Sequence, residues 1–551
     1  MLKEEILKFF SGEALDDQET LEKYSRDASV FHITPKIVLY PKDSEDIKKL
    51  VVWVSENKEK YSNLSITCRS AGTDMSGGAI GESIILDFTK YMNKLISFDS
   101  KKMQITAMPG MFYRDFEKIT LEKGLILPCY TASKSLNTIG GMYGNNSAGE
   151  RTLKYGKTEN YILEAKVIMA DGEERIIKPL DSKGLTGKLK QKDFEGKVYF
   201  EMNDLLTENM EEIKNARPKV HKNSAGYYLW NVINEGVFDL NKILVGSQGT
   251  LGIVTEITFR LVPEKKYSKL VAIFMKDLKP LGDLVDEILK HSPETLETYD
   301  DKTMKLAVRF FPDFLKNRGV WGMLKFMWSF LPEFKMMLTG GFPKMILLAE
   351  FSGEHEEDVH QKCSKLVDSI AHFKLKTHIT SSEIEAEKYW DVRRESFSLL
   401  RKHVSGKKTA PFIDDIIVRP EFLPVFLPEL NKLLSKYDLT YTIAGHAGDG
   451  NFHIIPLMDF KRADTAQIIF DLSDKVYDLV VKYEGSITAE HNDGIIRTPY
   501  LDKMFNAKIL TLFYGVKAIF DPLNIFNPGK KVPIPNGVGT RGYIKEHILK
   551  E

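Results

Sequence analysis

The spacing of apolar and polar positions near the start of the chain predicts strands and a helix around a polar turn. KIVLYP at 36–41 has the pattern of a strand. DSEDIKKLVVWVSENK after it places apolar residues at helical spacing behind an N-cap at Asp43 or Ser44. LSITCR and SIILDF then predict two strands on either side of SAGTDMSGGAIG. This order of elements indicates an α/β or α+β layer architecture.

The same reasoning divides the rest of the chain. Residues 161–172 and 252–262 are β-branched runs beside turn residues and predict further strands. After residue 265, KLVAIFM and MILLAEF predict strands, and each precedes a segment with helical spacing. Two strand–helix units of similar size suggest a ferredoxin-like sandwich. Residues 464–551 predict mainly helix, and residues 1–25 predict one or two short helices.

Composition and charge exclude several classes of protein. Hydrophobic residues make up 43% and charged residues 28%, and the 77 basic residues balance the 77 acidic ones. This balance argues against a nucleic-acid binder. The three cysteines form no CxxC pair, which excludes a zinc ribbon, a four-cysteine iron–sulfur cluster and a disulfide framework. The N-terminus carries acidic residues early and lacks a long apolar run, so we expect no secretory signal. The chain has no long uncharged apolar stretch, so we expect no transmembrane helix. A cytoplasmic protein is the resulting expectation.

Three glycine-rich stretches carry the first candidate chemistry. They are SAGTDMSGG at 70–78, TIGGMYGNNSAGERTLKYG at 138–156 and VGSQGTLGIV at 245–254. Glycines let backbone N–H groups turn toward an anion, so the first stretch is either a pyrophosphate cradle or a glycine-rich turn. The second is either a disordered loop or a surface shaped around a polar ligand, and the strand after it argues against disorder. None matches the Rossmann or P-loop pattern.

Histidines and a carboxylate carry the second candidate chemistry. His446 and His453 flank Gly448-Asp449-Gly450, and a tight turn between two strands would bring both imidazoles to one side. Glu490 and His491 follow about forty residues later. Two imidazoles and one carboxylate form a common catalytic metal set with positions left open for substrate. The alternative is that these histidines satisfy hydrogen bonds in a core.

The glycine-rich stretches, in this order, resemble the three FAD-contacting stretches of the vanillyl-alcohol-oxidase (PCMH-type) flavoprotein fold. Within it the chain resembles the glycolate oxidase/D-lactate dehydrogenase/D-2-hydroxyglutarate dehydrogenase family over residues 20–535. The resemblance implies an α+β fold. Its parts are a two-subdomain FAD-binding domain at 1–265 with a helical lead-in, a ferredoxin-like substrate (cap) domain at 266–465, and a helical C-terminal part of the FAD-linked oxidase domain at 466–551.

The resemblance also implies how FAD is held. Residues 69–78 would bind the diphosphate, 131–156 would wrap the isoalloxazine and ribityl region, and 246–254 would pack near the adenine. Many members of the wider fold attach FAD through a histidine in the first loop, which this chain lacks, so we expect non-covalent FAD, with linkage through Cys68 or Cys129 as the alternative. The implied FAD-binding residues are Arg69, Ser70, Ala71, Gly72, Thr73, Asp74, Ser76, Gly77, Thr138, Gly140, Gly141, Gly144, Asn145, Ser147, Gly249, Ile253 and Val254.

HAGDGNFH resembles the metal motif of the family. By this resemblance His446, His453 and Glu490 bind a divalent metal, zinc first and manganese or iron as alternatives, and His491 is the active-site base. Arg393 matches a substrate-binding arginine, and Arg497 is a second candidate for the substrate carboxylate. Asn492 departs from the glycine of many relatives.

The implied function is a dehydrogenase that oxidises a D-2-hydroxy acid to the 2-oxo acid. Some hydroxyglutarate-selective relatives carry a lysine where this chain has Ile413-Asp414-Asp415, which favours D-lactate, glycolate or another 2-hydroxy acid over D-2-hydroxyglutarate. Electrons would pass to an external acceptor, namely a quinone, a cytochrome or a separate iron–sulfur protein. The alternatives are a non-redox flavoenzyme like alkylglycerone-phosphate synthase, or a flavin-bearing electron-relay subunit.

The segment Phe311–Met345 is dense in Phe, Met, Trp and Leu and carries interspersed lysines and arginines. Interfacial helices combine these features. We predict either peripheral docking on the inner face of the cytoplasmic membrane, or packing on the second domain or in a homodimer contact.

Overall fold

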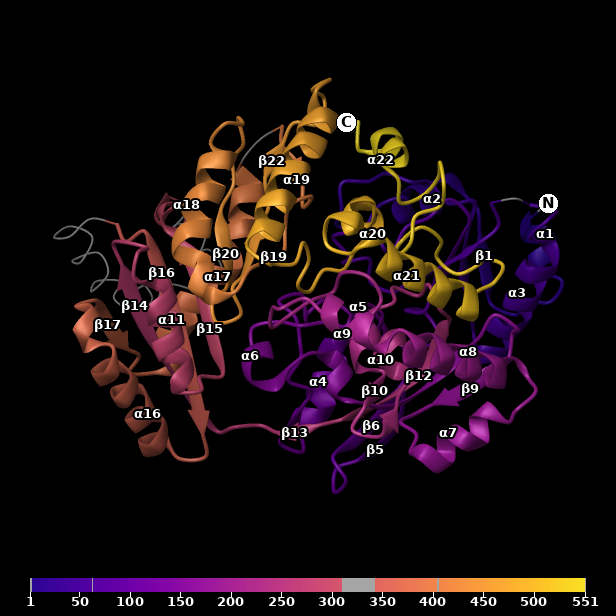
Figure 1. Ribbon diagram of the computed structural model, residues 1–551, viewed down its shortest axis with the longest axis horizontal. Coiled ribbons are helices and arrows are strands. Elements are labelled where there is room, and N and C mark those ends of the chain that lie inside the picture. The colour runs from indigo at the N-terminus through magenta and orange to yellow at the C-terminus, as the bar shows by residue number, and fades with distance from the viewer. Residues whose placement is uncertain (1, 62, 310–341, 404–405, 551) are drawn as a thin grey trace.

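The computed structural model describes residues 2–61, 63–309, 342–403 and 406–550. Figure 1 shows one lobe of indigo, magenta and yellow segments beside a second lobe of pink and orange segments. After the resemblance of the sequence, we call the first the FAD-domain lobe and the second the cap. Residues 310–341 lie outside the described part, so the docking role of Phe311–Met345 stays a prediction. Among the described helices, none has both the length and the apolar character needed to cross a membrane.

A four-stranded sheet forms the first subdomain. Its order is β1 (Glu13–Leu15), β2 (Ile37–Tyr40), β4 (Ile84–Asp87) and β3 (Ile66–Arg69), and β2, β4 and β3 run parallel. Helix α3 (Ser44–Asn57) begins where the Asp43 carboxylate accepts the N–H of Asp46, as the sequence predicts. Its apolar stripe packs in the core of this sheet. The short helices α1 (Leu2–Ile6) and α2 (Gln18–Tyr24) precede it.

A five-stranded antiparallel sheet forms the second subdomain. Its order is β5 (Leu95–Asp99), β6 (Gln104–Ala107), β12 (Ile253–Arg260), β8 (Ile162–Ile168) and β9 (Glu174–Ile177). Burial alternates along β12, because one face of the sheet meets the core. The larger helices of this subdomain are α4 (Tyr113–Leu121), α5 (Ile139–Asn145), α7 (Ser182–Leu189), α8 (Phe194–Glu208) and α9 (Met210–Ala216).

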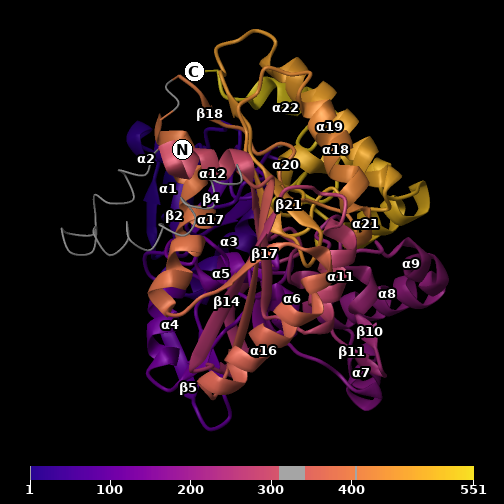
Figure 2. The same cartoon turned by 90° about the vertical axis from the view of Figure 1, so that its left-hand side faces the viewer.

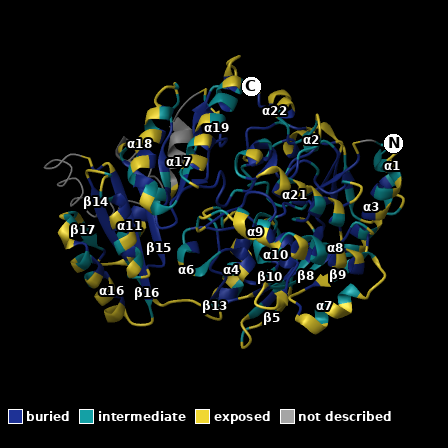
Figure 3. Ribbon diagram, viewed as in Figure 1, coloured by how far each residue is buried: buried dark blue, intermediate teal, exposed yellow. Residues whose placement is uncertain are grey.

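The cap contains the ferredoxin-like pattern that the sequence predicts. β14 (Tyr267–Met275), β15 (Thr295–Asp300), β16 (Met345–Gly353) and β17 (Lys376–Ile379) lie in the order β17-β14-β16-β15. Helices α11 (Leu281–Lys290) and α16 (Glu356–Ser369) share one core cluster on this sheet (Figure 2). Helix α17 (Glu383–His403) packs in the other cluster. Figure 3 shows the buried strands between helices whose outer faces are exposed.

Three further strands extend the cap sheet beyond β15 and carry the histidine motif. They are β20 (Ile443–His446), β21 (Asn451–Ile454) and β19 (Ile416–Ile417). Helices α18 (Leu423–Leu434) and α19 (Thr465–Lys482) pack on each other in the same lobe.

The final hundred residues divide between the lobes. Helix α19 belongs to the cap core, whereas α21 (Ala507–Phe520) packs on α8, and Ile525 and Phe526 enter the core of the first sheet. The segment expected at 466–551 as a helical C-terminal part is mainly helical and contributes to both lobes. The remaining elements are α6 (Thr152–Tyr155), α10 (Asn241–Leu244), α12 (Asp301–Arg309), α20 (Gly494–Arg497), α22 (Arg541–His547), β7 (Leu125–Ile126), β10 (Ile233–Asn234), β11 (Val237–Phe238), β13 (Val262–Pro263), β18 (Lys408–Thr409) and β22 (Leu457–Met458).

Candidate active site

A cavity of about 400 Å³ lies where the glycine-rich stretches of the FAD-domain lobe face the cap. All three stretches contribute to its wall, and the strands β20 and β21 close it from the cap side. Residues 395–403 of α17 are described only in their backbone. The predicted FAD-binding residues that line the cavity are Arg69, Ser70, Ala71, Gly72, Thr73, Asp74, Thr138, Gly140, Gly141, Gly144, Asn145, Ser147, Gly249 and Val254.

Three predicted FAD-binding residues lie behind this wall instead. The Ser76 hydroxyl donates to the Asp74 carboxylate at 2.9 Å and accepts from the Gln248 amide at 3.1 Å. A Cβ on Gly77 would meet the ring of Phe31, so this glycine allows close packing rather than ligand access. Ile253 is fully buried in the core of the first sheet. The sequence motif runs through the wall, and only some of its residues reach the cavity.

The loop at 70–73 suits a bound diphosphate. The backbone N–H groups of these four residues make no hydrogen bond to another described residue, although all four line the cavity. Such donors otherwise find partners in folded proteins. The Asp74 carboxylate accepts the N–H groups of Ser76 and Gly78 at 2.8 Å, which fixes the end of the loop. Four unpaired donors in a fixed turn form an anion-binding concavity.

The histidine hairpin forms as its sequence predicts. β20 and β21 pair antiparallel across the turn at 447–450. Gly450 has φ +75° and its Cβ position lies 1.8 Å from the Val418 carbonyl oxygen, so a side chain cannot occupy this position. The Nε2 atoms of His446 and His453 lie 3.3 Å apart. The hairpin therefore turns both imidazoles toward one point.

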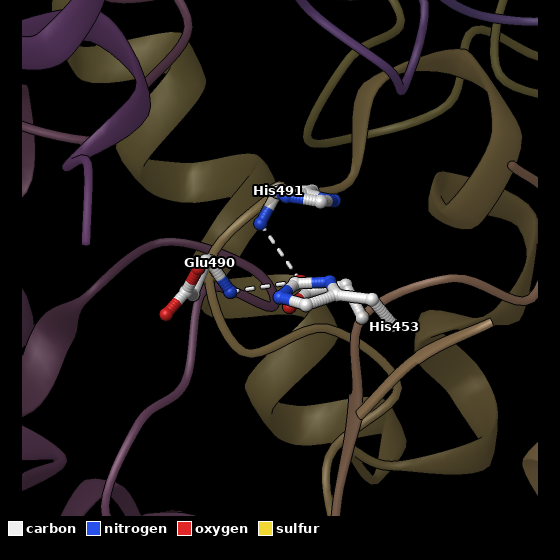
Figure 4. Close-up of side chains that lie close together, drawn as sticks. His453, Glu490 and His491 are labelled. Carbon is white, nitrogen blue, oxygen red and sulfur yellow. Dashed lines mark hydrogen bonds between the residues drawn. The ribbon is translucent and has the colours of Figure 1, made fainter. Parts of the chain in front are cut away.

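Glu490 and His491 reach the same point on a loop that Asp415 holds in place. The Asp415 carboxylate accepts the backbone N–H groups of Ala489, Glu490 and His491 at 2.9, 2.8 and 2.7 Å. Figure 4 shows Glu490 and His491 beside His453, which comes from a separate strand. The rings of His453 and His491 stack with centroids 5.0 Å apart. All three side chains line the cavity.

Two buried carboxylates orient the histidines from behind. Glu297 on β15 pairs with Nδ1 of His446. Asp414 lies 3.3 Å from Nδ1 of His453 and 2.7 Å from Nδ1 of His491. A proton held at Nδ1 of His446 or His453 turns the Nε2 atom of that ring toward the cavity side, where these two atoms meet.

These carboxylates also shift the titration of the histidines. Burial disfavours the charged form of His491, but Asp415 and Asp414 outweigh it and raise its pKa to about 9. Burial likewise opposes protonation of His446, and Glu297 raises its pKa to about 9. The pKa of Glu490 is held well below its usual range despite its burial, because Lys222 and His446 lie beside it. The site thus places ionised carboxylates against imidazoles.

Two of the three donor pairs in the predicted metal set have the spacing that a divalent metal needs. Nε2 of His446 lies 3.3 Å from Nε2 of His453 and 3.4 Å from Oε1 of Glu490. Ligands placed about 2.1 Å from a tetrahedral zinc are about 3.4 Å from one another. A different group, from Asp415, His453, Glu490 and His491, has all its donor atoms within 4.8 Å of one another. We favour the first group, because Asp415 is already bonded to three backbone N–H groups.

Two further residues beside this site, Lys222 and His221, were not predicted from the sequence. The Lys222 ammonium is fully buried and lies 2.6 Å from Glu490 and 2.7 Å from Asp449. Asp449 also pairs with His221. A buried ammonium between two carboxylates ties the FAD-domain lobe to both metal-candidate loops. Its separation of 268 residues from Glu490 leaves no local sequence signal.

The two candidate arginines have different surroundings. Arg393 on α17 lines the cavity, and its Nε donates to Glu297 at 2.8 Å. Arg497 is fully buried and donates to the backbone carbonyls of Asp414 and Asn492 at 2.8 and 3.1 Å. It lies outside the cavity lining, so the structure does not bring Arg497 to the position from which it was expected to bind the substrate carboxylate. Its guanidinium instead fixes the chain that carries Asp414.

Comparison with known proteins supports both lobes. Residues 35–177 match the family described as FAD binding domain, and residues 264–531 match FAD linked oxidases, C-terminal domain. The chain is 26% identical to D-2-hydroxyglutarate dehydrogenase of Pseudomonas putida over 530 residues, which cover 95% of this chain and 50% of that protein. It is 27% identical to glycolate oxidase subunit GlcD of Bacillus subtilis over 543 residues, covering 96% of each.

A third relative, D-lactate dehydrogenase of Anaerostipes hadrus, is 25% identical over 504 residues, covering 90% of this chain and 89% of that protein. The chain spans about half the length of several D-2-hydroxyglutarate dehydrogenases that it matches.

Solved structures agree on the fold. p-Cresol methylhydroxylase superposes with a TM-score of 0.66 at 15% identity, covering 95% of this chain and 94% of that one. Alkyldihydroxyacetonephosphate synthase superposes with a TM-score of 0.65 at 14% identity, covering 95% and 84%. At these identities the likeness concerns the fold alone. Segments from both lobes of the chain therefore match the FAD binding domain and the C-terminal domain of FAD linked oxidases.

Proposed function

We propose that this protein oxidises a D-2-hydroxy acid to the 2-oxo acid with FAD as the hydride acceptor and a divalent metal, zinc first, at His446, His453 and Glu490. The observation that carries the proposal is the convergence of these side chains with His491 and Arg393 on the cavity that the FAD-binding loops line. Relatives named D-2-hydroxyglutarate dehydrogenase, D-lactate dehydrogenase and glycolate oxidase subunit support the same class of substrate.

Arg393 and His491 would act directly on the substrate. Arg393 lines the cavity with its Nε bound to Glu297, and its guanidinium would bind the substrate carboxylate. His491 lines the cavity beside His453 and would accept the proton of the substrate hydroxyl. Asp414 behind the ring stabilises the imidazolium that forms. These groups fix the acid and remove its proton at neighbouring positions.

Bound FAD supplies a hydride acceptor, and a bound metal supplies a Lewis acid that lowers the pKa of the hydroxyl. The chain's contribution is position and electrostatics. The neutral, proton-accepting form of His491 is favoured when a cation is held beside it, which opposes the effect of Asp414 and Asp415 on its pKa. As the outlet for the electrons we propose an external acceptor, namely a quinone, a cytochrome or a separate iron–sulfur protein.

Anaerobic titration of the purified protein with a panel of D- and L-2-hydroxy acids tests the activity. We expect at least one D-acid to bleach the flavin absorption, while its L-enantiomer leaves the spectrum unchanged at the same concentration. The handed arrangement of Arg393, the metal ligands and His491 around one cavity is the reason for this selectivity. FAD that no 2-hydroxy acid reduces would instead support a non-redox flavoenzyme.

A substitution at Gly144 tests the FAD pocket. Gly144 lines the cavity, and nothing described lies within 4 Å of its Cβ position. We expect Gly144→Leu to place its side chain in the FAD volume and to lower FAD content by at least tenfold. The measurement is the ratio of flavin absorbance to protein after gel filtration.

Gly187→Leu is a matched control, because Gly187 also sits in a helix with an open Cβ position but lies outside the cavity lining. Full FAD content in Gly144→Leu would contradict the placement of FAD in this cavity.

Acid precipitation of the wild type should release the flavin, because burial raises the pKa of Cys68 to about 12 and keeps its thiol protonated. Flavin that stays with the precipitated chain would contradict non-covalent binding.

A further inference from the structure

An ion pair between the two lobes forms part of the cavity wall. Arg394 on α17 of the cap pairs with Glu150 in the second glycine-rich stretch, and both residues line the cavity. The Glu150 side chain is 9% exposed, whereas that of Arg394 is 42% exposed. The hydroxyl of Tyr130 lies 3.4 Å from the same Glu150 carboxylate. The carboxylate is therefore fixed from the FAD-domain side, and the guanidinium reaches it from the cap.

Each cavity-lining arginine that the structure describes already has an oxygen partner. Arg69 donates to the backbone carbonyls of Arg26 and Ala79 at 2.7 and 3.3 Å. Arg393 is held by Glu297. Arg394 is the remaining cation of the described lining apart from the histidines, and Glu150 compensates its charge.

A dicarboxylic substrate needs a second cation for its distal carboxylate. Near Arg394 that carboxylate would meet a guanidinium already paired with Glu150, and it would face the negative charge of Glu150. The neighbouring Arg151 is itself compensated, because the carboxylates of Glu350, Glu294 and Glu150 outweigh its burial and raise its pKa. Like charges brought together without compensation disfavour a ligand, and this is a common route to specificity.

We propose that Glu150 sets the substrate class of this enzyme: by neutralising Arg394 it excludes a second carboxylate, so that the site takes 2-hydroxy monocarboxylates. The turnover test of this inference rests on the proposed function, whereas the binding test does not. Loss of the Glu150 charge would convert Arg394 into a receptor for a distal carboxylate.

The test compares two acids of equal chain length, D-2-hydroxyglutarate and D-2-hydroxyvalerate. In Glu150→Gln we expect the ratio of their kcat/KM values, dicarboxylate over monocarboxylate, to rise about 10- to 100-fold, the size of effect that one new ion pair with the substrate produces. In Glu150→Gln/Arg394→Gln the ratio should fall back to the wild-type value. In Arg394→Gln alone it should fall below the wild-type value, because the Glu150 charge is then uncompensated.

A binding readout separates this inference from the proposed function. The dissociation constants of glutarate and valerate, which have no hydroxyl to oxidise, follow from the change in flavin absorption on titration. If no 2-hydroxy acid is oxidised but glutarate binds Glu150→Gln selectively, the proposed function fails and the role of Glu150 stands. If both ratios stay within twofold of wild type in Glu150→Gln and in Arg394→Gln, the inference is wrong.

Glu117→Gln is the matched control. Glu117 forms an ion pair with Lys134 at 3.0 Å in the same lobe and lies outside the cavity lining. Its substitution should leave both ratios at their wild-type values. Thermal melting and FAD content of every variant establish that each one folds. If Glu150→Gln does not fold, Arg394→Gln tests the inference alone. In that variant both dicarboxylate-to-monocarboxylate ratios should fall below their wild-type values.

Discussion

Replacing His491 with alanine should lower the rate of flavin reduction by ~10²–10⁴-fold, the range lost with a general base. The ring lies in the cavity wall, stacks on His453 and has its Nδ1 2.7 Å from the Asp414 carboxylate. This geometry leaves the other nitrogen available to a substrate proton. Stopped-flow mixing of oxidised enzyme with saturating substrate, without oxygen, measures the step directly and excludes effects on the electron acceptor.

FAD content and metal content should stay near wild type in this variant, because His491 is not among the three favoured metal ligands. His32→Ala is a matched control, since His32 forms an ion pair with Glu22 and lies outside the cavity lining. A His491→Ala protein that reduces its flavin at the wild-type rate would remove His491 from the mechanism. Loss of metal together with rate would instead favour the donor group that contains Asp415 and His491.

The histidine hairpin shows what the sequence could predict. Seven residues separate His446 from His453, and a tight turn between antiparallel strands places positions of this spacing on one side. Both side chains meet because the determinants are local, namely the strand pairing and a glycine that no other residue can replace at 450. The helix behind Asp43 and the two strand–helix units of the cap were predicted for the same reason.

The residues that pair with His446 and with Glu490 from behind could not be predicted in this way. Glu297 lies 149 residues before His446, and Lys222 lies 268 residues before Glu490. These pairs form only when the cap sheet places β15 beside β20 and when the two lobes meet. Sequence spacing carries no information about such contacts. They depend on sheet order and on lobe docking.

Arg497 shows a different limit. It follows Glu490 and His491 closely, and this proximity suggested a role in substrate binding. In the fold the short helix α20 turns its guanidinium into the protein, where two backbone carbonyls accept from it. Closeness along the chain does not fix the direction of a side chain. Ser76 and Gly77 lie outside the cavity lining for the same reason, because they form the back of the loop whose front lines the cavity.

Removing the metal should abolish oxidation of the 2-hydroxy acid while FAD stays bound. The favoured ligands come from the β20–β21 hairpin and from the loop after α19, whereas the candidate diphosphate contacts come from residues 70–73. The metal and FAD are therefore expected to bind to different segments of the chain. Dialysis against a chelator, followed by metal analysis, flavin absorbance and anaerobic reduction, separates the three quantities. Readdition of zinc, manganese or iron identifies the metal that restores the rate.

Substitution of Glu297 should weaken metal binding without removing a metal ligand. Glu297→Gln keeps the shape of the side chain but removes the charge that holds Nδ1 of His446 and Nε of Arg393. We expect metal affinity to fall about 10- to 100-fold, the usual effect of losing a group behind a metal ligand. His378→Ala is the control, because His378 pairs with Glu385 at 2.7 Å elsewhere in the cap. A chelated enzyme with full turnover would refute the metal site. Unchanged metal affinity in Glu297→Gln would show that His446 needs no partner to bind metal.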